Sequence, residues 1–348
     1  MKNAIETKNL TKVFNKFTAV NSLDLEIPNN TIFGMLGPNG AGKTTTIKML
    51  TCLIQPTSGQ AIVGGYDVQK NPDEVRNLLG MVPQQVSLYK DLTVMENSQL
   101  CADYYGVPLD ERDSRIEDLM EPVDIKYAKD KRVGQLSGGQ KQKASLVASL
   151  VHRPDILFLD EPTIGLDPTT KRTLWDLIRE LNDNGHTIIL CSHDMHEVDM
   201  LCDNVGIINT GNLVAYDTPQ GLKDSLLESN KLEMTEALSQ ISEENEVSTS
   251  TKEDIENLSL KKMSILLNNQ TDDIIDSIKK SSDIKSIEIS HNGRINLRVD
   301  GFDDMAVQNV INDIISAGGI IKSISTEEPS LEDVFIKATS EVNEDDRA

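Results

Sequence analysis

Short runs of apolar residues alternate with amphipathic segments over the first part of the chain. The runs DILFLD (155–160) and TIILCS (187–192) have the length of single strands and apolar inner positions. Such runs are typical of parallel strands that are buried on both faces of a sheet. TIFGML (31–36) leads into a glycine-rich stretch, and TTTIKML (44–50) predicts a helix directly after it. This alternation predicts a layered α/β domain, which we assign to residues 1–222.

A longer block lies between the glycine-rich stretch and the run at 155–160. Its segments LTVMENSQLCADYYGV and RIEDLM place apolar residues near the helical period of about 3.6. We therefore expect a helical subdomain at about residues 86–146, inserted between strands of the α/β domain.

The pattern changes after residue 222. Residues 223–258 are polar and acidic with few apolar positions, which predicts a flexible or partly helical linker. The apolar segments of residues 259–340 follow the order β-α-β-β-α-β, which predicts a small ferredoxin-like α+β domain. For the remaining residues, 341–348, the sequence predicts an acidic tail.

Composition limits the partners that this chain can bind. With 34 basic and 56 acidic residues among 348, its net charge is −22. We expect no nucleic-acid partner and no direct lipid contact, because nucleic-acid backbones and anionic headgroups attract Lys and Arg clusters. No apolar run approaches the roughly 20 residues of a membrane helix, and the N-terminus lacks the apolar core of a signal peptide. These features predict a cytoplasmic location, with any membrane contact made through another protein.

The glycine-rich stretch GPNGAGKTT has the form G-x-x-x-x-G-K-[ST]. Backbone N–H groups of such a loop surround phosphates, and the dipole of the following helix favours their charge. We expect Lys43 to reach the β- and γ-phosphates of a nucleotide and the Thr44 hydroxyl to bind Mg²⁺. The predicted phosphate-binding residues are Gly37, Pro38, Asn39, Gly40, Ala41, Gly42, Lys43, Thr44 and Thr45.

Two adjacent carboxylates, Asp160 and Glu161, end the apolar run at 155–160. Ligands of parallel sheets bind at the carboxyl ends of the strands. We expect Asp160 to hold Mg²⁺ and Glu161 to orient or deprotonate the attacking water. Acidic strand ends that face solvent are common in so acidic a chain, so this interpretation depends on the glycine-rich loop.

The segment LSGGQ, residues 136–140, precedes the apolar helix KQKASLVASLV and forms a second helix N-terminus suited to an anion. Taken alone, it fits an ordinary helix N-cap equally well. Together, however, GPNGAGKTT, LSGGQ and LFLDEP resemble the ATP-binding cassette ATPases in their order and spacing. The resemblance implies ATP contacts from four residues of the signature segment, Ser137, Gly138, Gly139 and Gln140.

The same resemblance implies roles for four more residues. Phe14 in LTKVF matches the aromatic residue that stacks on adenine, with Phe17 as a competitor. Gln84 in VPQQ matches the glutamine that reaches the metal and the water. Asp167 in IGLDP matches the loop that crosses to the partner subunit, and His193 in CSHD matches the histidine that senses the γ-phosphate. The implied catalytic set is Lys43, Gln84, Glu161 and His193, and the implied metal ligands are Thr44, Gln84 and Asp160.

The chain holds one glycine-rich loop and one signature segment. In the family that it resembles, the signature of one subunit closes over the ATP of the other. We therefore expect a dimer, with itself or with a related ATPase, that holds two ATP molecules at its interface. Ile164, where many members have Ser or Thr, and Lys143, where Arg is common, depart from the family pattern.

The C-terminal segment PSLEDVFIKATS (329–340) is similar to the ATPase subunits of ABC-2 type exporters of the drug-resistance-like group. This similarity implies a separate transmembrane permease, with the ATPase held at the inner face of the cell membrane through it. Two alternatives remain open. One is the ATPase subunit of an importer, which differs mainly in the C-terminal segment. The other is a non-transport ATPase, which would usually carry twin cassettes or a long coiled coil.

Overall fold

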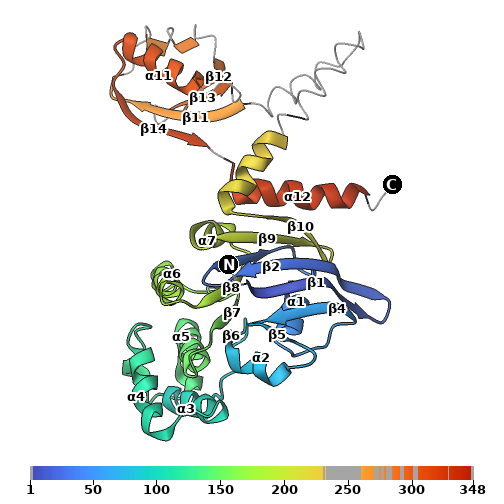
Figure 1. Cartoon of the computed structure of the whole chain (residues 1–348). Helices are drawn as coiled ribbons and strands as arrows, with labels where there is room; N and C mark the ends of the chain where they lie inside the picture. The colour runs from blue at the N-terminus through green and yellow to red at the C-terminus, as the bar shows by residue number, and fades with distance from the viewer. Residues whose placement is uncertain are drawn as a thin grey trace. The chain divides into compact units, whose positions relative to one another are not determined.

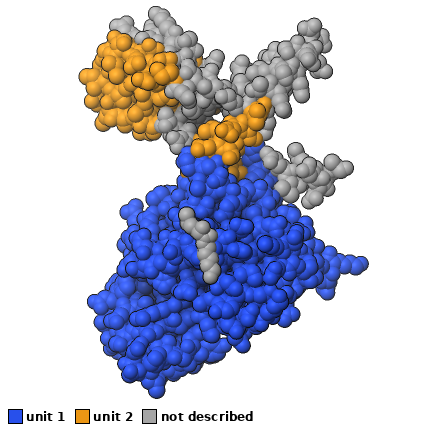
Figure 2. Space-filling view, in the orientation of Figure 1, with its two compact units in different colours: residues 1–222, 335–348 blue, residues 223–334 orange. Residues whose placement is uncertain are grey.

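The computed structural model forms two compact units, residues 1–222 with 335–348 and residues 223–334 (Figures 1 and 2). Of the predicted linker, residues up to 229 belong to a helix that begins at 219, and most of the others lie outside the described residues. None of the helices in the described residues is long and apolar enough to span a membrane. The structure describes residues 3–229, 232, 260–269, 274–275, 278–279, 284–290, 294–300, 305–327 and 329–345.

The larger sheet of the first unit has six strands in the order β10-β9-β3-β8-β7-β6. Its neighbours are parallel except for the edge strand β10, which runs antiparallel to β9. All residues of β8 and the first four of β7 are buried, which confirms the prediction of central parallel strands at 155–160 and 187–192. The strands are β3 (Ile32–Leu36), β6 (Leu79–Val82), β7 (Ile156–Asp160), β8 (Thr187–Cys191), β9 (Asn204–Asn209) and β10 (Asn212–Asp217).

A second sheet of the first unit is antiparallel, in the order β2-β1-β4-β5. One hydrophobic core joins this sheet to the parallel one and to helix α1, which contributes Ile47, Met49 and Leu50. Because α1 is anchored in this core, the glycine-rich loop before it has a fixed place. The elements are β1 (Asn3–Phe14), β2 (Phe17–Pro28), β4 (Ser58–Val63), β5 (Tyr66–Asp67) and α1 (Lys43–Leu50).

Helices connect the strands of the parallel sheet (Figure 1). The predicted helical insertion lies between β6 and β7 and contains three α-helices, which confirms this part of the fold class. Two further helices follow β7 and β8. The helices are α2 (Pro72–Leu78), α3 (Val94–Tyr104), α4 (Leu109–Met120), α5 (Gly138–Leu150), α6 (Pro168–Asp183) and α7 (Met195–Leu201).

The second unit has a four-stranded antiparallel sheet in the order β12-β13-β11-β14. The described residues 274–275 and 278–279 are helical and stand between β11 and β12, so the predicted β-α-β-β-α-β order is confirmed. Ile274, Ile278 and Ile314 pack in its core. The elements are β11 (Leu260–Leu267), β12 (Ile284–Ile289), β13 (Arg294–Asp300), α11 (Ala306–Ser316) and β14 (Ile321–Glu327).

The segment SLEDVF begins the terminal helix α12 (Leu331–Asp345). Ser330 and Asp333 close its first turn, since the Ser330 Oγ accepts from the Asp333 N–H at 3.2 Å and the Ser330 N–H donates to Asp333 Oδ2 at 2.8 Å. Residues 335–348 of the chain group with the first unit. There, Asn209 Nδ2 at the end of β9 donates to the carbonyl oxygen of Thr339 at 3.2 Å.

Helix α7 packs closely on β3 at Gly34. An added Cβ there would lie 2.7 Å from Val198 Cγ1 and 2.9 Å from Cys202 Sγ. We expect Gly34→Ala to lower the free energy of unfolding by about 1–3 kcal/mol, measured by urea denaturation of the nucleotide-free protein. In the control Gly138→Ala no atom lies within 4 Å of the added carbon, so the change should stay below about 0.5 kcal/mol. Equal effects would contradict close packing of α7 on β3.

Candidate active site

The glycine-rich loop joins β3 to α1 and depends on glycine at several positions, two of which lie next to the start of α1. Gly42, the N-cap of α1, has φ 109°, and an added Cβ would lie 2.4 Å from the carbonyl oxygen of Ala19. Gly40 has φ 85°, and no atom lies within 4 Å of its Cβ position. The backbone of the loop is therefore open to close approach by a ligand at Gly40. Asn39 is exposed, whereas Ala41 is buried beneath the loop.

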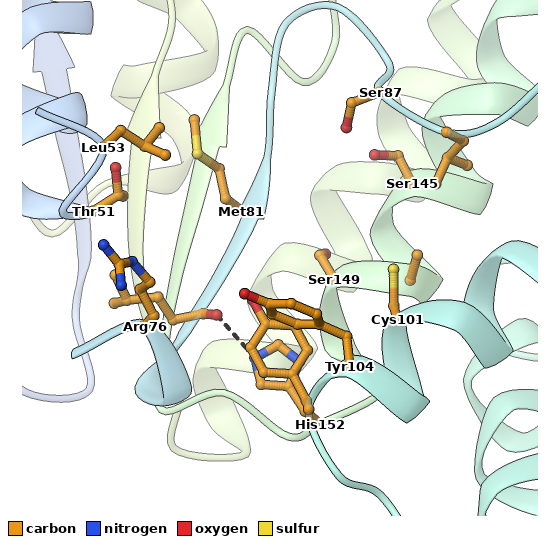
Figure 3. A pocket seen from close by; sticks show the side chains of 14 residues that line it. Thr51, Leu53, Arg76, Met81, Ser87, Cys101, Tyr104, Ser145, Ser149 and His152 are labelled. Carbon is orange, nitrogen blue, oxygen red and sulfur yellow. Dashed lines mark hydrogen bonds between the residues drawn. The ribbon is translucent and has the colours of Figure 1, made fainter. Parts of the chain in front are cut away.

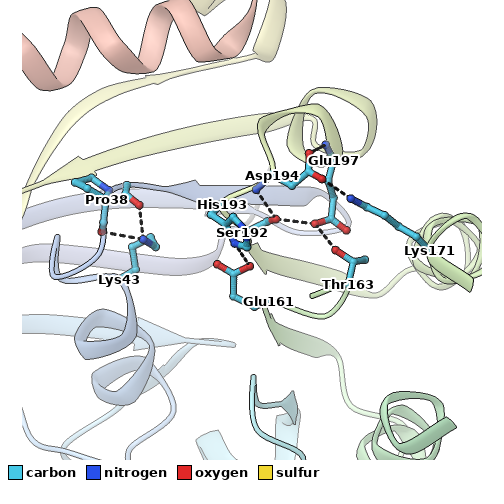
Figure 4. Close-up of polar contacts among 10 residues, drawn as sticks. Pro38, Lys43, Glu161, Thr163, Lys171, Ser192, His193, Asp194 and Glu197 are labelled. Atoms are coloured by element: carbon cyan, nitrogen blue, oxygen red, sulfur yellow. Dashed lines mark hydrogen bonds and ion pairs between the residues drawn. The ribbon is translucent and has the colours of Figure 1, made fainter. Parts of the chain in front are cut away.

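Lys43 lies beside Pro38 of the glycine-rich loop in the candidate site (Figure 4). Its Nζ donates to the carbonyl oxygens of Gly37 and Pro38, the latter at 3.1 Å. Burial lowers the pKa of the Lys43 ammonium, and the nearby carboxylates of Glu161 and Asp160 oppose this shift. The lysine thus connects the loop electrostatically with the two acids.

The next residues of α1 present their hydroxyls differently. The Thr44 side chain is exposed and the Thr45 side chain is half-buried. Thr46 is buried, with its Oγ1 donating to the carbonyl oxygen of Gly42 at 3.1 Å. Of these three hydroxyls, Thr44 is the one best exposed for a metal ion.

Asp160 and Glu161 stand at the carboxyl end of β7. Burial raises the pKa of Asp160, as does the neighbouring charge of Glu161, while Lys43 acts in the opposite direction. Glu161 has φ 52°, a left-handed conformation that costs a non-glycine residue of order 1–3 kcal/mol. Its N–H donates to the carbonyl oxygen of Cys191 at 2.8 Å, so the neighbouring strand β8 holds this conformation.

His193 lies directly against Glu161, with His193 Nδ1 2.6 Å from Glu161 Oε2 (Figure 4). The two residues follow adjacent parallel strands, in which Asp160 pairs with Cys191. Their exposure differs: the His193 side chain is 63% exposed and that of Glu161 only 14%. The sheet therefore brings together two of the predicted catalytic residues and leaves the imidazole accessible from solvent.

The signature segment caps the N-terminus of α5. Ser137 Oγ accepts from the Gln140 N–H at 3.3 Å, and Gln140 Oε1 accepts from the Ser137 N–H at 2.9 Å. Gln140 Nε2 also donates to the hydroxyl of Tyr127 at 2.9 Å. The ordinary N-cap that the sequence left open is thus present, and Ser137 and Gly138 remain exposed at the helix end. Gly139 is half-buried, and a Cβ there would lie 3.3 Å from Thr170 Cγ2.

The structure keeps the signature segment apart from the loop of its own chain. Among the described residues, no hydrogen bond or ion pair joins residues 136–140 to residues 37–45. The signature lies on the helical insertion, whereas the loop follows the central strand β3. One chain therefore presents the two helix ends predicted to bind anions at separate places.

Phe14 and Gln84 are both accessible. Phe14 ends β1 and is 45% exposed, with Lys12 Nζ 5.1 Å above its ring. Its competitor Phe17 starts β2 and is 63% exposed, so exposure alone does not choose between them. Gln84 is exposed, two residues after the end of β6.

Asp167 is the N-cap of α6. Its Oδ1 accepts from the N–H groups of Thr169 at 3.1 Å and Thr170 at 3.0 Å, and its Oδ2 accepts from Thr170 Oγ1 at 2.6 Å. Hydrogen bonds from the Thr170 hydroxyl and N–H lower the pKa of Asp167. Both oxygens of the Asp167 carboxylate therefore accept hydrogen bonds from the first turn of α6.

Sequence reasoning missed Glu197, a fully buried carboxylate on α7 beside the site. It accepts hydrogen bonds from Thr163, Trp175 and Ser192. In the sequence it is only an acid in the first turn of a helix, which the helix dipole favours at any surface. No pattern in one sequence distinguishes it from the exposed acids of this chain.

Comparisons with known proteins agree with this geometry. Residues 20–164 match the ABC transporter family, and residues 258–339 match the C-terminal domain of DrrA1-3-like ATP-binding proteins. The daunorubicin/doxorubicin resistance ATP-binding protein DrrA of Streptomyces peucetius is 40% identical over 223 residues, which is 64% of this chain and 68% of DrrA. The linearmycin resistance ATP-binding protein LnrL of Bacillus subtilis is 38% identical over 63% of this chain and 70% of LnrL.

Solved structures give the same result. The ATP-binding subunit of an ABC transporter superposes with a TM-score of 0.60 at 26% identity, over 64% of this chain and 92% of that one. The dimeric bacterial ABC transporter cassette MJ0796 superposes with a TM-score of 0.58 at 26% identity, over 62% and 98%. The chain therefore belongs to the ATP-binding cassette (ABC) transporter family, as an ATP-hydrolysing subunit of the ABC-2 exporter group.

Proposed function

We propose that this chain dimerises around two Mg²⁺-bound ATP molecules and drives a separate transmembrane permease that exports its cargo. The observation that carries the proposal is the contact of Glu161 with His193, together with the electrostatic interaction of Glu161 with Lys43 of the glycine-rich loop. The drug-resistance names of DrrA and LnrL favour export over import. The chain would then lie at the inner face of the cell membrane, held there by the permease.

The residues present fit a magnesium nucleotide. Gly40 leaves the backbone of the loop open, and α1 begins directly after it with N–H groups that have no partner within the helix. Exposed Thr44, half-buried Asp160 and exposed Gln84 supply hydroxyl, carboxylate and amide oxygens, which suit Mg²⁺. When bound, Mg²⁺ neutralises charge on the β- and γ-phosphates.

The protein groups around the γ-phosphate have distinct tasks. Lys43 exchanges its present loop carbonyl acceptors for phosphate oxygens. Glu161 accepts the proton of the attacking water, while its Oε2 keeps the contact with His193 Nδ1. The other ring nitrogen of His193, Nε2, donates to a γ-phosphate oxygen when the imidazole carries both protons. Phe14 stacks on the adenine ring.

The second phosphate-binding helix end comes from a second subunit. The signature helix α5 is capped but exposed at Ser137 and Gly138, and no described hydrogen bond or ion pair joins it to its own loop. A second subunit that contributes the signature segment would complete the charge neutralisation around one triphosphate. Asp167 and its loop lie between the Glu161 segment and α6, and we place them at the same interface. The partner is a second copy or a related ATPase.

The permease docks at a cleft between the α/β part and the helical insertion (Figure 3). The cleft has a volume of about 360 Å³ and is lined by Leu53 and Met81 on one side and by Tyr104 on the other. Leu53 and Tyr104 are 60% and 78% exposed. Ser87 also lines the cleft. It lies three residues after Gln84, so a short segment of the chain links the cleft to a predicted metal ligand. This apolar rim suits a short helix in a cytoplasmic loop of the permease.

Tyr89 directly follows Ser87 and Leu88, which line the cleft. Buried Asn97 of α3 accepts from the Tyr89 N–H at 2.8 Å and donates to the Tyr89 carbonyl oxygen at 3.0 Å. The backbone is thus fixed to the insertion, while the ring is 64% exposed. A movement of the insertion on dimer closure would therefore carry Tyr89 with it.

We expect Glu161→Gln to bind ATP within about twofold of the parent protein, because the amide keeps the size of the side chain. Hydrolysis should fall by more than about a hundredfold, because the amide cannot take the proton of water. ATP should then trap the closed dimer, measured by light scattering after size-exclusion chromatography. The control Glu180→Gln changes an exposed acid of α6 and should not accumulate dimer. The proposed dimer would be contradicted if the variant is fully occupied by nucleotide and still stays monomeric, both by itself and when mixed with related ATPases.

Asp160→Asn is expected to raise the thermal midpoint of the nucleotide-free protein. Because burial raises the pKa of Asp160, the ionised carboxylate lowers the free energy of unfolding at neutral pH. This loss of stability is absent below the ordinary pKa of Asp and grows as the pH rises through the raised pKa of the folded protein. Mg²⁺-dependent hydrolysis should fall by more than about a hundredfold. Asp155→Asn changes an exposed acid directly before the same strand and should change neither property. A lowered midpoint for Asp160→Asn would contradict the assigned burial cost.

Tyr89→Ala and Tyr104→Ala should each reduce transport by about tenfold or more, while ATP binding and basal hydrolysis of the isolated subunit stay within about twofold. The measurement is ATP-driven transport in vesicles that contain the permease, beside the ATPase rate of the subunit alone. Tyr66→Ala removes a tyrosine that is 41% exposed and does not line the cleft, and it should leave transport intact. Equal losses of ATP binding and transport would count against the docking surface.

A further inference from the structure

The carboxylate of Glu197 is fully buried and satisfied by three side-chain donors. Its Oε2 accepts from the Ser192 hydroxyl at 2.6 Å and from the Thr163 hydroxyl at 3.0 Å (Figure 4). Its Oε1 accepts from Trp175 Nε1 at 2.8 Å. A buried charge is costly unless it is hydrogen-bonded, and here both carboxylate oxygens are in use.

Two of these donors belong to the segments that carry the catalytic pair. Thr163 follows Glu161 by two residues, and Ser192 directly precedes His193. Both hydroxyls donate to the same oxygen atom, so one carboxylate oxygen joins the chain after β7 to the chain after β8. Thr163 and Ser192 are both buried, so water does not replace these bonds readily.

We propose that Glu197 is a positioning residue that holds Glu161 and His193 at their contact distance, an inference that rests on the proposed role of these two residues in hydrolysis. Glu197 itself touches neither the water nor the phosphate. It acts through Thr163 and Ser192. Their hydrogen bonds to Glu197 fix the positions of the chain segments that carry Glu161 and His193.

The helix that carries Glu197 is itself firmly fixed. Asp194 caps α7, with Oδ1 accepting from the Glu197 N–H at 3.1 Å, and its own N–H donates to Ser192 Oγ at 3.1 Å. Asp194 Oδ2 pairs with Lys171 of α6. On its other side α7 packs on β3 at Gly34. The carboxylate therefore cannot follow a displaced Glu161 segment without moving a helix.

The left-handed backbone of Glu161 explains why such a support is needed. A conformation that costs of order 1–3 kcal/mol persists only where surrounding contacts impose it. The Glu161 N–H is bound to the Cys191 carbonyl on the strand side, and Thr163 is bound to Glu197 just beyond it. Loss of the second contact leaves the strained residue free to relax, and a displacement of about 1 Å at a catalytic group can cost about a hundredfold in rate.

The test compares substitutions of two donors to the same carboxylate. Thr163→Val removes the hydroxyl at nearly constant volume, and Trp175→Phe removes the ring N–H that comes from α6. Both leave Glu197 with one donor fewer, so both should lower the thermal midpoint. Only Thr163→Val should lower kcat, by about tenfold, with KM for ATP within about twofold. Trp175→Phe should keep kcat within about twofold.

Two further variants separate positioning from stability alone. Thr163→Ser restores the hydroxyl and should recover kcat to within about threefold of the parent protein. Glu197→Gln replaces one acceptor oxygen by a donor and should lower kcat with little change in KM. In a Glu161→Gln background, Thr163→Val should have no further effect on the residual rate, because the group that it positions is already inactive.

The inference is overturned if Thr163→Val and Trp175→Phe lower kcat equally, if Thr163→Ser does not rescue, or if Glu197→Gln keeps full kcat. These outcomes differ from failure of the proposed function. A parent protein without ATP hydrolysis would contradict the proposed function before any variant is compared. A parent protein that hydrolyses ATP, with variants that lower only the thermal midpoint, would contradict the positioning role alone.

Discussion

The candidate active site depends on the parallel pairing of β7 with β8. Their register sets Asp160 opposite Cys191, and the chain then leaves both strands at one edge of the sheet. That edge is where ligands of parallel sheets bind, and it brings Glu161 and His193 to 2.6 Å although 32 residues separate them. Five consecutive residue pairs, from Ile156 with Thr187 to Asp160 with Cys191, keep the two strands in step, so their carboxyl ends lie side by side. The contact of Glu161 with His193 is thus a consequence of how two hydrophobic strands pair.

Several residues of the site stabilise the fold and are also predicted to bind the nucleotide. Ser137 and Gln140 form the capping box of α5, and Asp167 caps α6. Caps of this kind are worth about 1 kcal/mol each. A helix end that needs a polar residue for its own N–H groups is also a good place for an anion, so one motif can serve both purposes. Structural and functional interpretations of these residues are therefore not in competition.

The same site also contains groups that are unfavourable in the folded protein. Glu161 has a left-handed backbone, burial raises the pKa of Asp160, and burial lowers that of Lys43. Each of these features costs free energy in the folded protein relative to the unfolded chain. Such unfavourable groups are common at sites that bind a charged ligand. The buried carboxylate of Glu197 accepts hydrogen bonds from Thr163 and Ser192, and so connects the segment after β7 to the end of β8 beside these unfavourable groups.

The sequence by itself determined the parts that depend on local pattern. The runs at 155–160 and 187–192 are buried parallel strands, GPNGAGKTT joins a strand to a helix, and the segments after residue 259 fold in β-α-β-β-α-β order. It did not reveal the antiparallel sheet of β1 and β2, the strained backbone of Glu161 or the burial of Glu197. These depend on contacts between residues far apart in the chain, such as Thr163 with Glu197, and no local period encodes them. Periodicity shows which face of an element is buried, whereas only the tertiary structure decides which polar groups meet there.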